Sequence, residues 1–166
     1  MLTDRPLRSE TDPPYRERRG DRFRHLFQAE PAAVRDALRR AVARFARQIT
    51  IEDAGTLELT LAEALNNVVE HGYARLEPGP VDLRIVKSDE ALECRIVDAG
   101  VPMPGLTLPD IPMQEIPDEI EALPEGGWGW ALIRELTTNL AYQRENERNI
   151  LTFHVPVSHR RGTDKT

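Results

Sequence analysis

The chain has 166 residues, of which 40% are hydrophobic and 30% are charged, and its formal net charge is −6. This composition is typical of one globular domain with an apolar core, and it excludes a chain that is disordered throughout. An acidic chain has no general electrostatic attraction for nucleic acid or for an anionic membrane, so we expect direct contact with neither. Residues 1–10 lack an apolar signal region, and no apolar run approaches the roughly 18 residues of a membrane span, so we expect a cytoplasmic protein.

The composition divides the chain into two tails and a domain. Residues 1–20 are polar and rich in arginine and proline, and we predict that they form a flexible N-terminal tail. Residues 158–166 have a similar character and are predicted to form a C-terminal tail. The folded domain is therefore expected to span residues 21–157. Cys94 is the only cysteine, which excludes an internal disulfide and a multi-cysteine metal site.

The first half of this domain alternates between strand and helix patterns. Residues 23–28 can form a strand, and Pro31 then suits the first turn of a helix that is predicted to run to Gln48. Helical spacing of apolar residues returns between Leu57 and His71. Gly72 is expected to end that second helix as its C-cap.

The second half begins with two alternating segments, 81–87 and 92–96, which predict an antiparallel hairpin. Residues 101–125 contain six prolines and six acidic residues but no lysine or arginine. Because proline removes amide donors, we expect a long loop with only short regular structure, and such loops are usually functional. Three further elements are predicted to complete the domain: a helix over 127–140 and strands over 140–144 and 149–155. The predicted fold class is α+β, a two-layer sandwich with helices on one face of a mostly antiparallel sheet.

The polar face of the helix over 57–71 carries the first candidate for chemistry. Glu63 and Asn67 are four residues apart, so their side chains lie one above the other on the same helix face. A carboxylate there can accept a proton, and an amide oxygen can bind a hard cation such as magnesium. A solvated polar face is the simple alternative for such a pair. Asparagine is a poor helix former, however, so two adjacent asparagines within a helix call for a reason.

Two glycine-containing motifs follow. Asp98-Ala99-Gly100 comes directly after a strand, where a carboxylate can accept a hydrogen bond from an exocyclic amine and glycine permits a close approach to a flat ring. A simple turn is the alternative. Gly126-Gly127-Trp128-Gly129 opens a helix, where backbone N–H groups and the helix dipole favour an anion such as phosphate. A flexible hinge is the alternative there, and the motif fits neither the Walker A loop nor the Rossmann fingerprint.

The order of these motifs resembles that of the GHKL ATPase family, in which an N box, a G1 box and a G2 box follow one another along a Bergerat fold. Residues 63–73 (EALNNVVEHGY) look like the N box of the RsbW-type anti-sigma factor serine/threonine kinases, and the His-Gly-Tyr ending is distinctive. Residues 127–136 (GWGWALIREL) look like the G2 box of the same branch. The resemblance covers about residues 23–155.

The resemblance implies ATP and Mg²⁺ as cofactors. Asp98 would bind the adenine amino group, with Gly100 beside the ring, and Asn67 would hold the magnesium that bridges the phosphates. An ATP lid would extend over about residues 101–125. From its end, two glycines would face the phosphates: Gly127 and Gly129.

The resemblance also implies a reaction and partners. Glu63 would act as general base on a serine or threonine hydroxyl of a STAS-domain anti-anti-sigma factor. A sigma factor would be the second partner, and the chain would form a homodimer. Some positions depart from the family pattern: Pro102 and Ala131 stand where glycine is frequent, and Thr138 stands where an acid is common. Two bulky residues, Trp128 and Trp130, lie beside the predicted phosphate site. Two alternatives therefore stay open, namely an ATP-binding partner-switch module that does not phosphorylate, and a STAS-protein kinase without a sigma factor partner.

Overall fold

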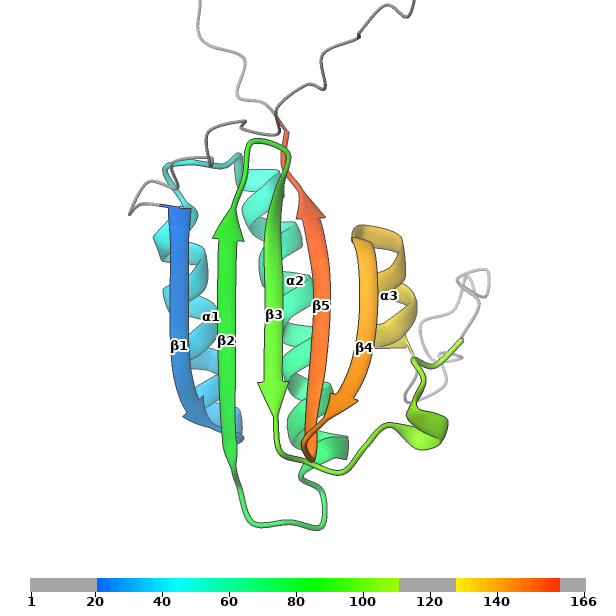
Figure 1. The fold of residues 1–166 in the computed structure, drawn as a ribbon. Helices are drawn as coiled ribbons and strands as arrows, with labels where there is room; N and C mark the ends of the chain where they lie inside the picture. The colour runs from blue at the N-terminus through cyan, green and yellow to red at the C-terminus, as the bar shows by residue number, and fades with distance from the viewer. Residues whose placement is uncertain (1–20, 111–127, 159–166) are drawn as a thin grey trace, which may run out of the picture.

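The computed structural model describes residues 21–110 and 128–158, and its centre is a five-stranded sheet (Figure 1). The strand order is β1-β2-β3-β5-β4, and every neighbouring pair is antiparallel. The strands have these bounds: β1 Arg22–Gln28, β2 Pro80–Lys87, β3 Ala91–Asp98, β4 Thr138–Glu145 and β5 Arg148–Pro156. The two segments that predicted a hairpin are β2 and β3, and the strands predicted over 23–28 and 149–155 are β1 and β5.

The helices form the second layer. Figure 1 shows α1 and α2 covering one face of the sheet, with α3 beside β4. The helical elements have these bounds: α1 Pro31–Phe45, α2 Ile51–Asn67, the π-helical turn η2 Val68–Gly72, the 3₁₀ turn η3 Pro104–Leu106, and α3 Trp128–Leu136. The predicted α+β two-layer sandwich is confirmed. Within residues 21–110 and 128–158, no helix has both the length and the apolar character needed to cross a lipid bilayer.

The core fills the space between these layers. Buried side chains of α1 and α2, among them Phe45, Leu57 and Leu61, face buried residues of the central strands such as Ile96 and Phe153. The alternation of β3 and β5 and the helical spacing of α1 and α2 direct these apolar residues to the same interface. Their burial provides the main favourable free energy of folding, and it fixes how α2 lies across the sheet.

The helix α2 begins at Ile51, six residues before the predicted start at Leu57. The reason is an N-cap: the Thr50 hydroxyl oxygen accepts a hydrogen bond from the Asp53 N–H at 3.0 Å. The Asp53 carboxylate is itself buried and accepts hydrogen bonds from the N–H and hydroxyl of Ser158. Ser158 was assigned to the C-terminal tail, and this contact connects it to the domain; residues 159–166 and 1–20 lie outside the described part of the chain.

The end of α2 also differs from the regular α-helix that was expected. From Val68 to Gly72 the chain forms a π-helical turn, which the Tyr73 N–H closes by donating to the Val68 carbonyl at 3.1 Å. Single π-helical turns are rare and occur frequently at functional sites. Here the turn places Val68, His71 and Gly72 beside the end of β3.

The last helix was predicted too long. The helix α3 ends at Leu136 rather than Leu140, and β4 begins at Thr138. Asn139 adopts a positive φ of 53°, a conformation that asparagine tolerates better than most residues and that no helix interior uses. Leu140, which also fits the helical spacing, therefore lies in the strand β4 together with Tyr142.

The segment after β3 has little regular structure, as the prolines predicted. Between Val101 and Asp110 the only regular turn is η3, where Gly105 has a positive φ of 65°. The remainder of the predicted lid, from residue 111 to 125, lies outside the described residues, and so does Gly127.

Candidate functional site

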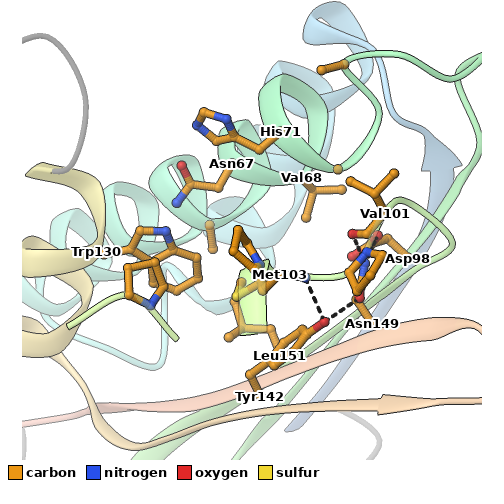
Figure 2. A pocket seen from close by; sticks show the side chains of 16 residues that line it. Asn67, Val68, His71, Asp98, Val101, Met103, Trp130, Tyr142, Asn149 and Leu151 are labelled. Atoms are coloured by element: carbon orange, nitrogen blue, oxygen red, sulfur yellow. Dashed lines mark hydrogen bonds between the residues drawn. The ribbon is translucent and has the colours of Figure 1, made fainter. Parts of the chain in front are cut away.

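A cavity of about 420 Å³ opens between the end of α2, the segment after β3, the helix α3, and the strands β4 and β5 (Figure 2). Its size falls in the usual range of small-molecule sites. The lining is mostly apolar with a few polar groups: Ala64, Asn67, Val68, His71, Gly72, Ala74, Asp98, Val101, Pro102, Met103, Pro104, Pro109, Trp130, Tyr142, Asn149 and Leu151. Two of the residues predicted from the sequence, Asn67 and Asp98, therefore share one cavity although they lie 31 positions apart in the chain.

The two ends of this cavity differ in chemistry. Figure 2 shows Asp98 and Asn149 at one end and the indole ring of Trp130 at the other, with Asn67 on the helical side between them. Trp130 is 8% exposed and packs into the core as well as lining the cavity. One end thus offers a carboxylate, and the other lies beside the helix α3.

Asp98 is the last residue of β3, and its carboxylate is 6% exposed. Its Oδ1 atom accepts hydrogen bonds from the Gly100 N–H at 2.8 Å and from Asn149 Nδ2 at 2.9 Å. Burial raises the pKa of this carboxyl above its ordinary value, and the hydrogen bonds from Asn149 and Gly100 and the charge of Arg144 oppose that rise. A buried carboxylate with unused acceptor capacity suits a ligand that donates a hydrogen bond.

Gly100 contributes to the site through the backbone. A Cβ atom at this position would lie 2.6 Å from the carbonyl oxygen of Gly72, which is too close for any side chain. The Val101 N–H donates to the same carbonyl at 2.8 Å. The missing side chain at Gly100 therefore lets the end of the π-helical turn meet the chain directly after Asp98. Gly100 is buried and lies outside the cavity lining, so its placement beside a bound ring stays a prediction.

The tyrosine that closes the N-box resemblance also positions this region. The Tyr73 hydroxyl accepts a hydrogen bond from the Ala99 N–H at 2.8 Å and donates one to the Pro80 carbonyl at 3.1 Å. Its ring packs so closely on Gly79 that a Cβ atom there would lie 2.6 Å from Tyr73 Cε1. Tyr73 thus holds the end of β3 against the start of β2.

Asn67 projects into the cavity from the last position of α2. Within the described residues, its Nδ2 atom is buried and has no hydrogen-bond partner. A half turn of the amide would bring the oxygen to the same place, because the two orientations differ only in which atom is N and which is O. An unpartnered buried amide costs about 1–3 kcal/mol, which a ligand in the cavity would relieve.

These residues fit a magnesium ion that is bound together with phosphates. No cluster of three or more His, Cys, Asp or Glu side chains occurs in residues 21–110 and 128–158. Mg²⁺, however, commonly uses one or two protein ligands and takes its other ligands from water and substrate phosphates. The amide oxygen of Asn67 is a ligand of the required type.

Glu63 lies one turn before Asn67, and its carboxylate reaches the first turn of α3. A Cβ atom on Gly129 would lie 2.5 Å from Glu63 Oε2, so a side chain at this position would displace the carboxylate. The structure therefore brings Glu63 and Gly129 together, next to the cavity end at Trp130. The N-terminal end of a helix favours negative charge, which suits both this carboxylate and an anionic ligand.

The sequence reasoning missed a group of polar residues on β4 and β5. Asn149 is 6% exposed and binds Asp98, while its Oδ1 atom accepts from the Tyr142 hydroxyl at 2.6 Å and from Arg144 Nη1 at 2.8 Å. One signal was present: Asn149 is in phase with the buried Leu151, Phe153 and Val155, so a polar residue sits at a position where the alternation expects an apolar one.

Arg134 lies in the last turn of α3. In the structure its guanidinium donates two hydrogen bonds to the Pro109 carbonyl, from Nε at 3.2 Å and from Nη2 at 2.9 Å. Arg134 thus connects α3 to the segment after β3, which lines the same cavity.

A family profile and a known protein kinase both match the sequence of this chain. The family profile described as "Histidine kinase-like ATPase domain" matches residues 27–155. The chain is 30% identical over 98 residues to the serine/threonine-protein kinase BtrW of Bordetella bronchiseptica. The aligned region covers 59% of this chain and 67% of that protein.

A solved structure has a similar fold. It contains the RsbU and RsbW domains of Rv1364c from Mycobacterium tuberculosis, and it matches with a TM-score of 0.59 at 16% identity over 84% of this chain. The present chain spans about a third of that protein (33%). The family match covers both the strand end at Asp98 and the helix that carries Glu63 and Asn67. The chain therefore belongs to the histidine kinase-like ATPase domain family.

Proposed function

We propose that this protein is an ATP-dependent serine/threonine kinase and anti-sigma factor that phosphorylates a STAS-domain anti-anti-sigma protein in a partner-switching pathway. The observation that carries the proposal is the cavity shared by Asn67 and Asp98, with Glu63 against Gly129 at the N-terminal end of α3 beside it. Membership of the ATPase family and the similarity to the kinase BtrW support it.

Asp98 would select the base. Its Oδ1 atom is taken by two donors of the protein, so Oδ2 is the oxygen for an exocyclic amine such as that of adenine. The apolar lining from Val68, Met103 and Leu151 suits the faces of a flat ring.

Asn67, Gly129 and Glu63 would act at the phosphate end. Bound ATP supplies the transferable phosphoryl group, and Mg²⁺ offsets the negative charge of its phosphates. Asn67 would give its amide oxygen to the ion, and the backbone of Gly129 would face the phosphates. Glu63 would take the proton of the attacking hydroxyl, a contribution of about 10²–10⁴-fold for a positioned base.

The partners are part of the proposal. Its substrate would be a serine or threonine of a STAS-domain protein, its second partner a sigma factor, and its assembly a homodimer. One observation favours the alternative, an ATP-binding partner-switch module that does not phosphorylate. The bulky indole of Trp130 lines the cavity, next to positions at which the family pattern has small residues.

Calorimetric titration with ATP, with and without Mg²⁺, tests the nucleotide site in the wild type and in Asp98→Asn. Magnesium-dependent binding that the substitution weakens is the expected result, and no binding at millimolar ATP would overturn the proposal. Single-turnover transfer from labelled ATP to a STAS protein then separates the kinase from the non-phosphorylating module. A pull-down probed for sigma factors separates the anti-sigma factor from a kinase that acts on STAS proteins alone.

A further inference from the structure

We propose that Asn149 is a positioning residue that orients Asp98 for base recognition and, through Tyr142, couples this recognition to the chain segment Val101–Met103. This inference rests on the proposed function, because it concerns the same nucleotide site. The side chains concerned lie on β4 and β5, outside the N, G1 and G2 boxes. They contact these motifs only at Asp98 and at the residues directly after it.

The orientation of the Asn149 amide follows from its partners. Arg144 can only donate hydrogen bonds, so the atom at 2.8 Å from Arg144 Nη1 must be the oxygen. The Nδ2 group therefore points to the other side, where it donates to Asp98 Oδ1 at 2.9 Å and to the Val101 carbonyl at 3.0 Å. These hydrogen bonds are buried or partly buried, so an alternative pairing with water is disfavoured.

This arrangement decides which oxygen of Asp98 meets a ligand. The hydrogen bonds that Asp98 accepts from described residues, those of Asn149 and Gly100, both fall on Oδ1. Oδ2 is thereby left for the cavity. Because Asn149 already uses both of its amide groups on the protein, it has no hydrogen bond left to give to the base, and it acts on the ligand only through Asp98.

The same amide is connected to the segment after β3. The Tyr142 hydroxyl donates to Asn149 Oδ1 at 2.6 Å and accepts from the Met103 N–H at 3.0 Å (Figure 2). Met103 and Val101 line the cavity. A hydrogen-bonded chain therefore runs from Asp98 through Asn149 and Tyr142 to the backbone of Met103. A base that fixes Asp98 also stabilises the segment that covers it.

The test compares ATP with inosine triphosphate, which carries an oxo group where adenine has the exocyclic amine. Calorimetry gives the ratio of the two affinities for the wild type and for Asn149→Ala. We expect the wild type to prefer ATP and Asn149→Ala to lower that ratio by about ten- to a hundredfold, as for the loss of one hydrogen bond to a charged group, mainly through weaker ATP binding. Thr152→Ala, on the same strand but facing the other side of the sheet, is the matched control and should keep the ratio.

The variant Tyr142→Phe tests the coupling to Met103 separately from the recognition of the base by Asp98. It removes only the hydroxyl and keeps the hydrogen bond from Arg144 that orients the Asn149 amide, so the ratio of ATP to inosine triphosphate affinity should fall less than in Asn149→Ala. Hydrogen exchange at the Met103 amide should no longer slow when ATP binds. Unchanged ATP-dependent protection of Met103 in this variant would overturn the coupling.

The outcomes distinguish this inference from the proposed function. A wild type that does not bind ATP would overturn the proposed function and this inference with it. ATP binding by the wild type, together with an unchanged ratio or an equal loss of both nucleotides in Asn149→Ala, would overturn only the positioning role. If Asn149→Ala fails to fold, Asn149→Leu keeps the approximate volume of the side chain, removes the donor to Asp98, and must lower the ratio in the same way.

Discussion

The carboxylate of Glu63 lies directly against the backbone of Gly129, so that a Cβ atom at position 129 would be 2.5 Å from Glu63 Oε2 and 3.6 Å from Glu63 Cβ. This contact connects the polar face of α2 with the first turn of α3. A glycine in a nucleotide-binding motif is usually explained by its contact with phosphate. Here the same glycine also makes room for the proposed general base.

We therefore expect Gly129→Ala to displace the Glu63 carboxylate and to slow phosphotransfer more than it weakens ATP binding. Loss of a positioned base predicts a decrease of about 10²-fold in single-turnover transfer to a STAS protein. Gly55→Ala is the matched control, because a Cβ at this glycine of α2 meets nothing within 4 Å. Equal transfer rates for Gly129→Ala and Gly55→Ala would show that this contact is irrelevant to the reaction.

Glu63→Ala should keep ATP binding and lose transfer by about 10²–10⁴-fold, the usual contribution of a general base. Glu63→Gln keeps the shape of the side chain without its basicity and should be impaired similarly. Rapid-quench transfer and calorimetry on the same preparations provide the comparison. A full transfer rate in Glu63→Gln would remove Glu63 from the proposed mechanism.

Asn67→Ala should abolish magnesium-dependent ATP binding while the fold stays intact. The Nδ2 atom of Asn67 is buried without a partner in the described residues, so the substitution removes an unsatisfied donor. Titration with ATP in the presence of Mg²⁺ and in EDTA, together with thermal unfolding, tests both parts. An affinity equal to that of the wild type in Mg²⁺ would contradict the assignment of Asn67 to the ion.

Asp98→Asn should weaken ATP binding and make the unliganded domain more stable at neutral pH. Burial raises the pKa of Asp98, so the folded state binds the proton more tightly than the unfolded state does. The resulting stabilisation is complete below the ordinary pKa of a carboxyl group and is lost as the pH rises through the raised value. An amide at position 98 does not titrate, and its oxygen can still accept from Gly100 and Asn149.

The free energy of unfolding, measured with urea between pH 3.5 and 8, checks this expectation. The difference between Asp98→Asn and the wild type should grow in favour of the variant as the pH rises, and then level off. A difference that shrinks over the same range would show that the Asp98 carboxylate is stabilised, not destabilised, by its surroundings.

Gly100→Ala should destabilise the domain even without nucleotide. The added methyl group would lie 2.6 Å from the Gly72 carbonyl oxygen and 2.9 Å from Asp98 Oδ1, and a backbone group cannot move aside as a flexible side chain can. Overpacking of this kind costs about 1–3 kcal/mol. Gly55→Ala should instead stabilise the protein by about 0.5–1 kcal/mol, because the exposed helix interior disfavours glycine. Chemical unfolding of both variants measures the contrast.

Local patterns were enough to predict most of the elements. The period-two alternation gave β1, β2, β3 and β5, since such alternation is set by the pleat of each strand itself. Element ends were predicted less well. The helix α2 starts directly after its N-cap Thr50, which lies before the apolar stripe. The helix α3 ends before Asn139, whose positive φ was not evident from the sequence.

The candidate site also combines features that could be predicted from the sequence with features that could not. Sequence by itself determined that Glu63 and Asn67 share one helix face and that Asp98 ends a strand, because these relations depend only on the geometry of a single element. The tertiary structure alone decided that Asn149 holds Asp98 from 51 residues away and that Gly100 meets Gly72. It also decided that Glu63 rests on Gly129. Such contacts depend on the order of the strands in the sheet and on the packing of α2 against α3. Both result from the burial of the whole core, so the spacing of residues within one element does not predict them.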